Sequence, residues 1–135
     1  MNKKGFTLAE LLGVIVILAI ISTLVVISVS RVVDNGKKGV YQNLETTLRG
    51  GTENYFIDNT SSIPAVNASK SITYTELLKG NYIDEFEDPK GRDCSSSYVI
   101  VSRTMDKGVN FTLIYKSCVI CKDNAGNIHY KTEGC

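Results

Sequence analysis

An apolar run near the start constrains this chain more than any other feature. From Leu11 to Ser30 the sequence has 20 consecutive residues without a charge, most of them Ile, Val or Leu. A helix of that length is ~30 Å long, which matches the hydrocarbon thickness of a bilayer. We therefore expect a single helix that is able to cross a membrane.

A lone carboxylate, Glu10, stands at the head of this run. Such a charge costs ~2.5–3.5 kcal/mol inside a membrane, so we expect the protein to supply Glu10 with a partner. Lys3 and Lys4 precede the run, which predicts a cytoplasmic N-terminus and an external chain after Arg31. A cleaved secretory signal fits poorly because the run exceeds the usual ~7–15 residues. A plain anchor would leave Glu10 without a role.

The segment around this carboxylate resembles the leader of type IV pilins and pseudopilins. Residues 3–12 read KKGFTLAELL, with basic residues, a glycine and Phe-Thr-Leu-x-Glu ahead of an unbroken apolar helix. The resemblance implies a leader at residues 1–5, which a prepilin peptidase removes by cutting between Gly5 and Phe6 on the cytoplasmic side. It also implies N-methylation of Phe6 and retention of the helix, because the cut falls before it.

The chemistry of the new terminus gives Glu10 a role in assembly. Cleavage creates an α-amine on Phe6, four residues before Glu10. In a bundle of helices the amine of one copy can meet Glu10 of another, and a close opposite charge favours both ionised forms. Sliding one helix past its neighbour would leave a buried charge unpaired, so the pairing would fix the axial register.

The expected fold class is α+β, with a long N-terminal helix packed on a small antiparallel sheet tied by disulfides, as in the pilin fold. We expect a transmembrane and filament-core helix at 6–30, an amphipathic helix at 31–57 and a globular head at 58–135. The apolar stripe of the amphipathic half is predicted at the helical spacing of Val32, Val33, Val40, Leu44, Leu48 and Tyr55.

Glycines interrupt this helical pattern. Gly36, Gly39 and the pair Gly50-Gly51 each weaken a helix by ~1 kcal/mol relative to Ala, so we expect bends or a frayed turn there. Many type IV pilins carry a proline in the apolar segment where this chain has Ile27 or its neighbours. Whether the helix melts locally on assembly therefore stays open.

In the head, residues 58–73 are rich in Ser, Asn and Thr and are expected to form the αβ-loop. Thr73 and Glu76 fit a capping box ahead of a short helix that stops at Gly80. Strands are predicted at 97–103, 109–116 and 128–131, the first two joined as a hairpin. We expect these three antiparallel strands to pack against the long helix.

The head packs only ~60 residues, so its core needs reinforcement. Its cysteines, Cys94, Cys118, Cys121 and Cys135, form an even set behind an export-like segment, which indicates two disulfides in an oxidising compartment. Closing the hairpin brings Cys94 near Cys118 or Cys121, and a one-residue change in the turn decides which. We favour Cys94 with Cys121 and Cys118 with Cys135, and the opposite choice stays open.

Other chemical readings are weaker. Cys118 and Cys121 have the spacing of a redox dithiol but end a strand instead of opening a helix, and a zinc site would need a second short pair. His129 with Asp123 or Asp106 has no spacing typical of a catalytic triad. The acidic residues Asp84, Glu85, Glu87 and Asp88 lack the order of a calcium loop, so a solvated loop is the better interpretation. We expect no enzyme activity, no metal and no cofactor.

The sequence therefore predicts a structural subunit of a type IV pilus or pseudopilus, first in the cell membrane with its C-terminus outside and then in a surface filament. The resemblance implies as partners the prepilin peptidase, a membrane platform protein, an assembly ATPase and further copies of the chain. The alternative is a minor tip pilin that binds a surface, DNA or a secreted substrate. The 105 residues after Ser30 hold 13 acidic and 13 basic residues, so nucleic acid is expected only for a DNA-uptake pilus.

Overall fold

A computed structural model describes residues 5–108 and 110–135 of the chain, and within them it leaves out the side chains of 24–28. Lys3, Lys4 and Val109, which carry parts of the predictions above, lie outside the described residues. The chain divides into two compact units, residues 1–38 and residues 39–135. Each unit is described by itself.

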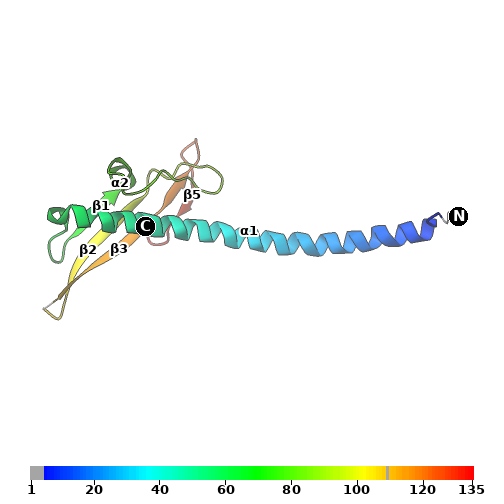
Figure 1. The fold of residues 1–135 in the computed structure, drawn as a ribbon, viewed down its shortest axis with the longest axis horizontal. Coiled ribbons are helices and arrows are strands. Elements are labelled where there is room, and N and C mark those ends of the chain that lie inside the picture. Colours follow the sequence, from blue (N-terminus) through cyan, green and yellow to red (C-terminus); the bar gives the residue numbers. More distant parts are fainter. Residues whose placement is uncertain (1–4, 109) are drawn as a thin grey trace. The chain divides into compact units, whose positions relative to one another are not determined.

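The first helix, α1, runs from Leu8 to Asp58 and contains 51 residues, as the sequence predicted (Figure 1). The expected frayed turn is wrong, because the backbone is helical at Gly36, Gly39, Gly50 and Gly51. For Gly51 the reason is packing: a Cβ there would lie 2.4 Å from Cγ2 of Ile83 and 3.1 Å from the carbonyl oxygen of Tyr82. This glycine lets the chain after the second helix approach α1 closely.

In the first unit the apolar side chains of α1 are exposed. The large apolar residues from Leu11 to Ile21 are between 48% and 60% exposed. The hydroxyls of Ser22 and Thr23 donate to the carbonyl oxygens of Leu18 and Ile20, both at 2.7 Å, so these two polar side chains are satisfied within the helix. In the part of the chain that the structure describes, no helix combines the length and the apolar content needed to span a membrane. The transmembrane segment therefore stays a prediction, and residues 24–28 within it lie outside the described side chains.

The second unit holds a three-stranded antiparallel sheet in the order β1-β2-β3. Its strands are β1 (Ser69–Thr73), β2 (Tyr98–Asp106) and β3 (Asn110–Cys118), and β2 and β3 form the predicted hairpin. β1 corrects the sequence analysis, which placed residues 58–73 in a loop. Its sequence Ser-Lys-Ser-Ile-Thr buries only Ile72, which lies opposite Val99, so its pairing with β2 decides the strand. The rest of the expected loop includes a 3-10 turn at Thr60–Ser62.

A smaller two-stranded sheet pairs β4 (Ile120–Lys122) with β5 (Ile128–Lys131). The strand predicted at 128–131 therefore exists, but its expected place beside the hairpin is wrong. That place belongs to β1. The turn between β4 and β5 returns the chain to the short strand directly after the hairpin, so β5 pairs locally instead of joining the larger sheet.

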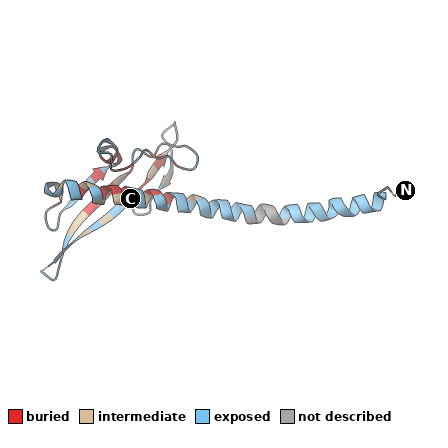
Figure 2. Cartoon of the chain, viewed as in Figure 1, coloured by how far each residue is buried: buried red, intermediate tan, exposed pale blue. Residues whose placement is uncertain are grey.

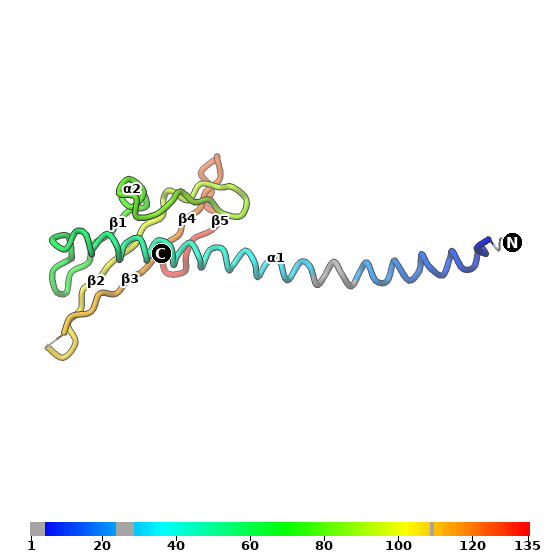
Figure 3. Tube along the Cα trace, in the orientation of Figure 1, coloured from blue at the N-terminus to red at the C-terminus, as the bar shows by residue number. Residues whose placement is uncertain are grey.

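The second helix, α2, runs from Tyr74 to Lys79 and confirms the predicted capping box. Thr73 N donates to Oε2 of Glu76 at 2.8 Å, and Glu76 N donates to Oγ1 of Thr73 at 3.2 Å. Gly80 follows as the C-cap. The long connection from α2 to β2 then covers residues 80–97 (Figure 3).

The core of the second unit lies between α1 and the sheet (Figure 2). Five helical residues face it, at spacings of three or four: Tyr41, Leu44, Leu48, Thr52 and Phe56. The apolar residues opposite come from β1, α2 and β2 and include Ile72, Leu77, Val99 and Val101.

The predicted stripe was therefore only partly right. Leu44 and Leu48 are buried and Tyr55 packs at the margin of the core. Val32 and Val33 are 70% and 47% exposed, and Val40 is exposed as well. The valines follow a helical spacing, but Val32 and Val33 belong to the first unit and none of the three is part of the buried core of the second.

Both disulfides have the pairing that the sequence analysis favoured, Cys94 with Cys121 and Cys118 with Cys135. The first links the chain before β2 to β4. The second links the end of β3 to Cys135. Together they tie the small sheet and the last residues to the hairpin.

Candidate functional site

The predicted cleavage site lies in non-helical backbone ahead of α1. Residues 5–7 precede the first helical turn, and the side chain of Phe6 is 86% exposed. A Cβ built on Gly5 would meet nothing within 4 Å, so packing within the described chain does not require a glycine there. The bond between Gly5 and Phe6 is therefore accessible, and the small residue suits the close approach of a protease to the backbone.

Glu10 forms a capping box with Thr7 at the start of α1. Its Oε2 accepts hydrogen bonds from Thr7 N at 2.8 Å and from Thr7 Oγ1 at 2.9 Å. Glu10 N in turn donates to Thr7 Oγ1 at 3.3 Å. The two hydrogen bonds from Thr7 stabilise the carboxylate within its own chain. The same box satisfies the backbone N–H groups of Thr7 and Glu10 at the start of the helix, where the helix itself supplies no acceptor.

Thr7 is the residue that the sequence analysis missed. The same Thr-x-x-Glu spacing occurs at Thr73 and Glu76, where it was recognised, and the two boxes agree to about 0.1 Å in their hydrogen bonds. The signal was therefore present at Thr7. Glu10 therefore has a local partner in Thr7 besides the partner expected in another copy.

The second oxygen of Glu10, Oε1, makes no hydrogen bond to any residue that the structure describes. The capping box therefore leaves half of the carboxylate accessible at an exposed position on α1. Cleavage after Gly5 would keep Thr7 and place the new amine of Phe6 one residue before it. The site can thus hold its local cap and accept a hydrogen bond from a second amine at the same time.

In the second unit, the buried carboxylate of Asp88 ties the connection after α2 to α1 through Tyr41. The Asp88 side chain is fully buried and pairs with the guanidinium of Arg92. It also accepts hydrogen bonds from Lys90 N at 2.8 Å and from Tyr41 Oη at 3.2 Å. Burial raises the pKa of Asp88, but the hydrogen bonds from Arg92 and Lys90 outweigh it and hold this pKa below its usual value.

Asp88 corrects the earlier interpretation of the acidic cluster as a solvated loop. Asp84, Glu85 and Glu87 are exposed, whereas Asp88 is a buried structural anion. The oxygens of Asp88 are used by donors from its own loop and from α1. These contacts stabilise the fold of the second unit.

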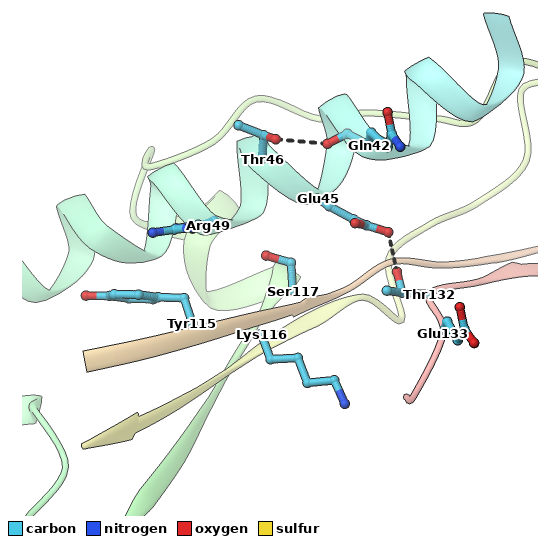
Figure 4. A pocket seen from close by; sticks show the side chains of 9 residues that line it. All are labelled: Gln42, Glu45, Thr46, Arg49, Tyr115, Lys116, Ser117, Thr132 and Glu133. Carbon is cyan, nitrogen blue, oxygen red and sulfur yellow. Dashed lines mark hydrogen bonds between the residues drawn. The ribbon is translucent and has the colours of Figure 1, made fainter. Parts of the chain in front are cut away.

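A second set of contacts fixes the end of the chain to α1. The rings of Tyr41 and Tyr130 stack with centroids 3.6 Å apart, and Oε1 of Glu45 accepts from Tyr130 Oη at 3.1 Å and Thr132 Oγ1 at 2.8 Å. Beside these contacts a groove of about 460 Å³ lies between α1, the end of β3 and residues 132–133 (Figure 4). Its lining mixes carboxylates and cations, among them Glu45 and Arg49.

The remaining chemical candidates have structural roles in the described residues. His129 Nε2 lies 2.7 Å from Oδ2 of Asp123, and that carboxylate also accepts from Ala125 N and Asn127 N, each at 2.9 Å. The hydrogen bond with His129, followed by those from Asn127, lowers the pKa of Asp123 well below its usual range. The pair orders the turn before β5. Asp106, the other acid considered, ends β2 opposite Asn110.

Cys118 and Cys121 belong to different disulfides, so this close pair does not form a bridge of its own. A redox centre would need the two sulfurs to share one bond. In this structure Cys121 instead links β4 to the chain before β2, and Cys118 links the end of β3 to Cys135.

Comparison with known proteins bears on the N-terminal segment. Residues 1–26 match the family model of the prokaryotic N-terminal methylation motif. A search of curated proteins and a search of solved structures each gave no match. The matched range contains Gly5, Phe6, Thr7 and Glu10. The first 26 residues therefore carry the class III signal of a type IV pilin-like or pseudopilin precursor.

Proposed function

We propose that the chain is a structural subunit of a type IV pilus or pseudopilus, cut after Gly5, methylated on Phe6 and polymerised through α1. One observation carries the proposal: a methylation motif leads directly into an apolar helix whose side chains are exposed in the first unit. Exposed apolar surface of this extent is a sign of an interaction partner. In the filament the partner is the apolar part of α1 in other copies, and before assembly it is the cell membrane.

In this proposal, copies add head to tail through a heterologous interface that does not close, which produces a fibre. The free Oε1 of Glu10 accepts the Phe6 amine of a neighbouring copy, while Oε2 keeps its bonds to Thr7. A prepilin peptidase, a membrane platform protein and an assembly ATPase serve the process. The chain itself acts structurally and not as an enzyme.

Intact mass of the chain purified from its own cells tests the processing. The expected mass lacks residues 1–5, carries one methyl group and is lower by the hydrogens lost in two disulfides. A mass that retains the leader, with filaments present, would contradict the proposal.

Two variants separate the local role of Glu10 from its role between copies. Glu10→Gln removes the charge that a neighbour's amine needs, so we expect cleavage to continue and filaments to disappear. Thr7→Val is the matched control, since it removes the hydroxyl of the capping box and keeps the carboxylate. Gln at position 10 keeps the capping box, because either Glu or Gln can complete it. An unchanged filament yield in Glu10→Gln, with a reduced yield in Thr7→Val, would therefore show that Glu10 acts as a helix cap alone and that the pairing between copies is wrong.

A further inference from the structure

Among the residues that the structure describes, no strand lies beside the outer edge of β3. β3 ends the order β1-β2-β3 and pairs with β2. Arg103 N donates to Ala68 O at 3.0 Å and Asn67 N donates to Arg103 O at 2.8 Å, so the backbone groups of Arg103 point toward the β1 side. Because these directions alternate along an antiparallel strand, Ser102 and Thr104 point toward β3.

The register then shows toward which side the backbone N–H and C=O groups of each β3 residue point. Ser102 lies opposite Ile114 and Thr104 opposite Thr112, so these two residues of β3 bond to β2. The backbone N–H and C=O groups of the alternate residues point outward: Phe111, Leu113, Tyr115 and Ser117. Within the described residues, none of these eight groups takes part in a hydrogen bond of a turn, loop, cap or side chain.

This edge also lacks the usual protection of a free strand. From Asn110 to Tyr115 the sequence is NFTLIY, with no charge, glycine or proline, and Phe111 and Ile114 are more than half exposed. Natural edges are usually short, charged or covered, because an open one pairs with other chains. The opposite edge shows the contrast: β1 has five residues, and the N–H of Thr73 is bound by Glu76.

A groove lies beside the end of this open edge. Tyr115 and Ser117 line the groove of about 460 Å³ on the side of β3 that faces α1 (Figure 4). Of its two cations, Arg49 is paired with a carboxylate, since its Nε lies 2.9 Å from Oε1 of Glu53. Lys116 donates to the neutral carbonyl oxygen of Gly134 and keeps its positive charge.

Among the described residues, the two carboxylates of the groove have no cationic partner. Glu133 is exposed and has no ion pair among the residues that the structure describes, and Glu45 accepts only neutral hydroxyls. With Arg49 paired to Glu53, the groove holds the two negative charges of Glu45 and Glu133 against the one positive charge of Lys116, so its remaining net charge is negative.

We propose that the β3 edge is a strand-addition site for an extended polypeptide segment with a Lys or Arg side chain, which enters the groove near Glu45 and Glu133. The main chain of the segment pairs with the outward groups of Leu113, Tyr115 and Ser117. In such sites the backbone ladder supplies affinity and the neighbouring pocket supplies specificity. The site does not involve the apolar part of α1, so it is independent of the role proposed for that helix in the filament.

The test uses the full chain in detergent micelles and a fluorescent palindromic peptide, Thr-Val-Thr-Lys-Thr-Val-Thr, which can pair in either direction. A second peptide has Glu in place of Lys. Fluorescence anisotropy is expected to give a dissociation constant about tenfold lower for the Lys peptide. Amide exchange of the wild-type chain should slow at Leu113 and Tyr115 when the Lys peptide is present.

Two pairs of variants test the two parts of the site. Ser117→Pro removes an outward N–H without touching the ladder to β2 and is expected to weaken binding about tenfold, while Ser117→Ala keeps it. Glu133→Gln should reduce the preference for Lys over Glu severalfold, and Glu85→Gln, at an exposed position in the connection after α2, should not.

Three results would overturn the proposal. The first is an absence of binding at millimolar peptide. The second is binding that leaves exchange at Leu113 and Tyr115 unchanged. The third is protection of these amides that rises with protein concentration without peptide, which would assign the edge to a second copy. The exchange measurement needs no variant, so a folding defect in Ser117→Pro does not weaken the test.

Discussion

Gly50 and Gly51 are neighbours in the same helix, yet the structure predicts opposite effects of an alanine at each. A Cβ on Gly50 would meet nothing within 4 Å, so Gly50→Ala adds only helix propensity and should stabilise by about 0.5–1 kcal/mol. A Cβ on Gly51 would lie 2.4 Å from Ile83 Cγ2 and 3.1 Å from the Tyr82 carbonyl oxygen.

At Gly51 the same gain in propensity is set against overpacking. Ile83 is buried and the Tyr82 atom belongs to the backbone, so neither can move aside freely. Overpacking of this kind costs about 1–3 kcal/mol, which makes Gly51→Ala neutral to destabilising by about 2 kcal/mol. The two variants should therefore differ in stability by about 1–3 kcal/mol.

The measurement is thermal unfolding of the full chain in one detergent, followed by the near-ultraviolet circular dichroism of its tyrosines. A domain of this size shifts its midpoint by about 4–8 °C per kcal/mol, so the two variants should be separated by at least about 4 °C. Equal shifts of the same sign would refute the close approach of residues 82–83 to α1, and with it the reason given for a glycine at this position.

Three further predictions concern the ties within the second unit. Asp88→Asn should lower stability by about 1.5–3 kcal/mol in chemical denaturation near neutral pH. The pKa of Asp88 is held below its ordinary value, so its carboxylate stabilises the fold above the unfolded pKa and loses this effect as the pH falls through the folded pKa. The difference between wild type and variant should therefore shrink in acid, and a constant difference would contradict this. Cys118→Ser with Cys135→Ser opens a bond between residues 17 apart in sequence and should cost about 2–4 kcal/mol by the same assay, with loss of protection from exchange at β5; unchanged protection there would show that the bond does not hold the small sheet. Thr73→Ala should cost about 1 kcal/mol by removing the cap of α2, whereas Thr46→Ala, whose hydroxyl bonds only to the carbonyl of Gln42 within α1, should cost less; equal losses would argue against the capping box.

Contacts between residues close in sequence were predictable. The length of α1, the hairpin of β2 and β3 and the cap of α2 depend on periodicity, turn residues and a Thr-x-x-Glu spacing. The same spacing at Thr7 and Glu10 shows that a local signal can be present and still be assigned to a different role.

The sequence by itself determined the N-terminal signal and the long helix, because cleavage motifs and helical hydrogen bonds join residues within about four positions of each other. The tertiary structure decided which face of α1 is buried, that β1 joins the sheet while β5 pairs with β4, and that Asp88 is a buried anion. It also decided which edge of the sheet stays open. These properties arise from contacts between segments far apart in the chain, and the free energy of each contact depends on what the rest of the fold places beside it.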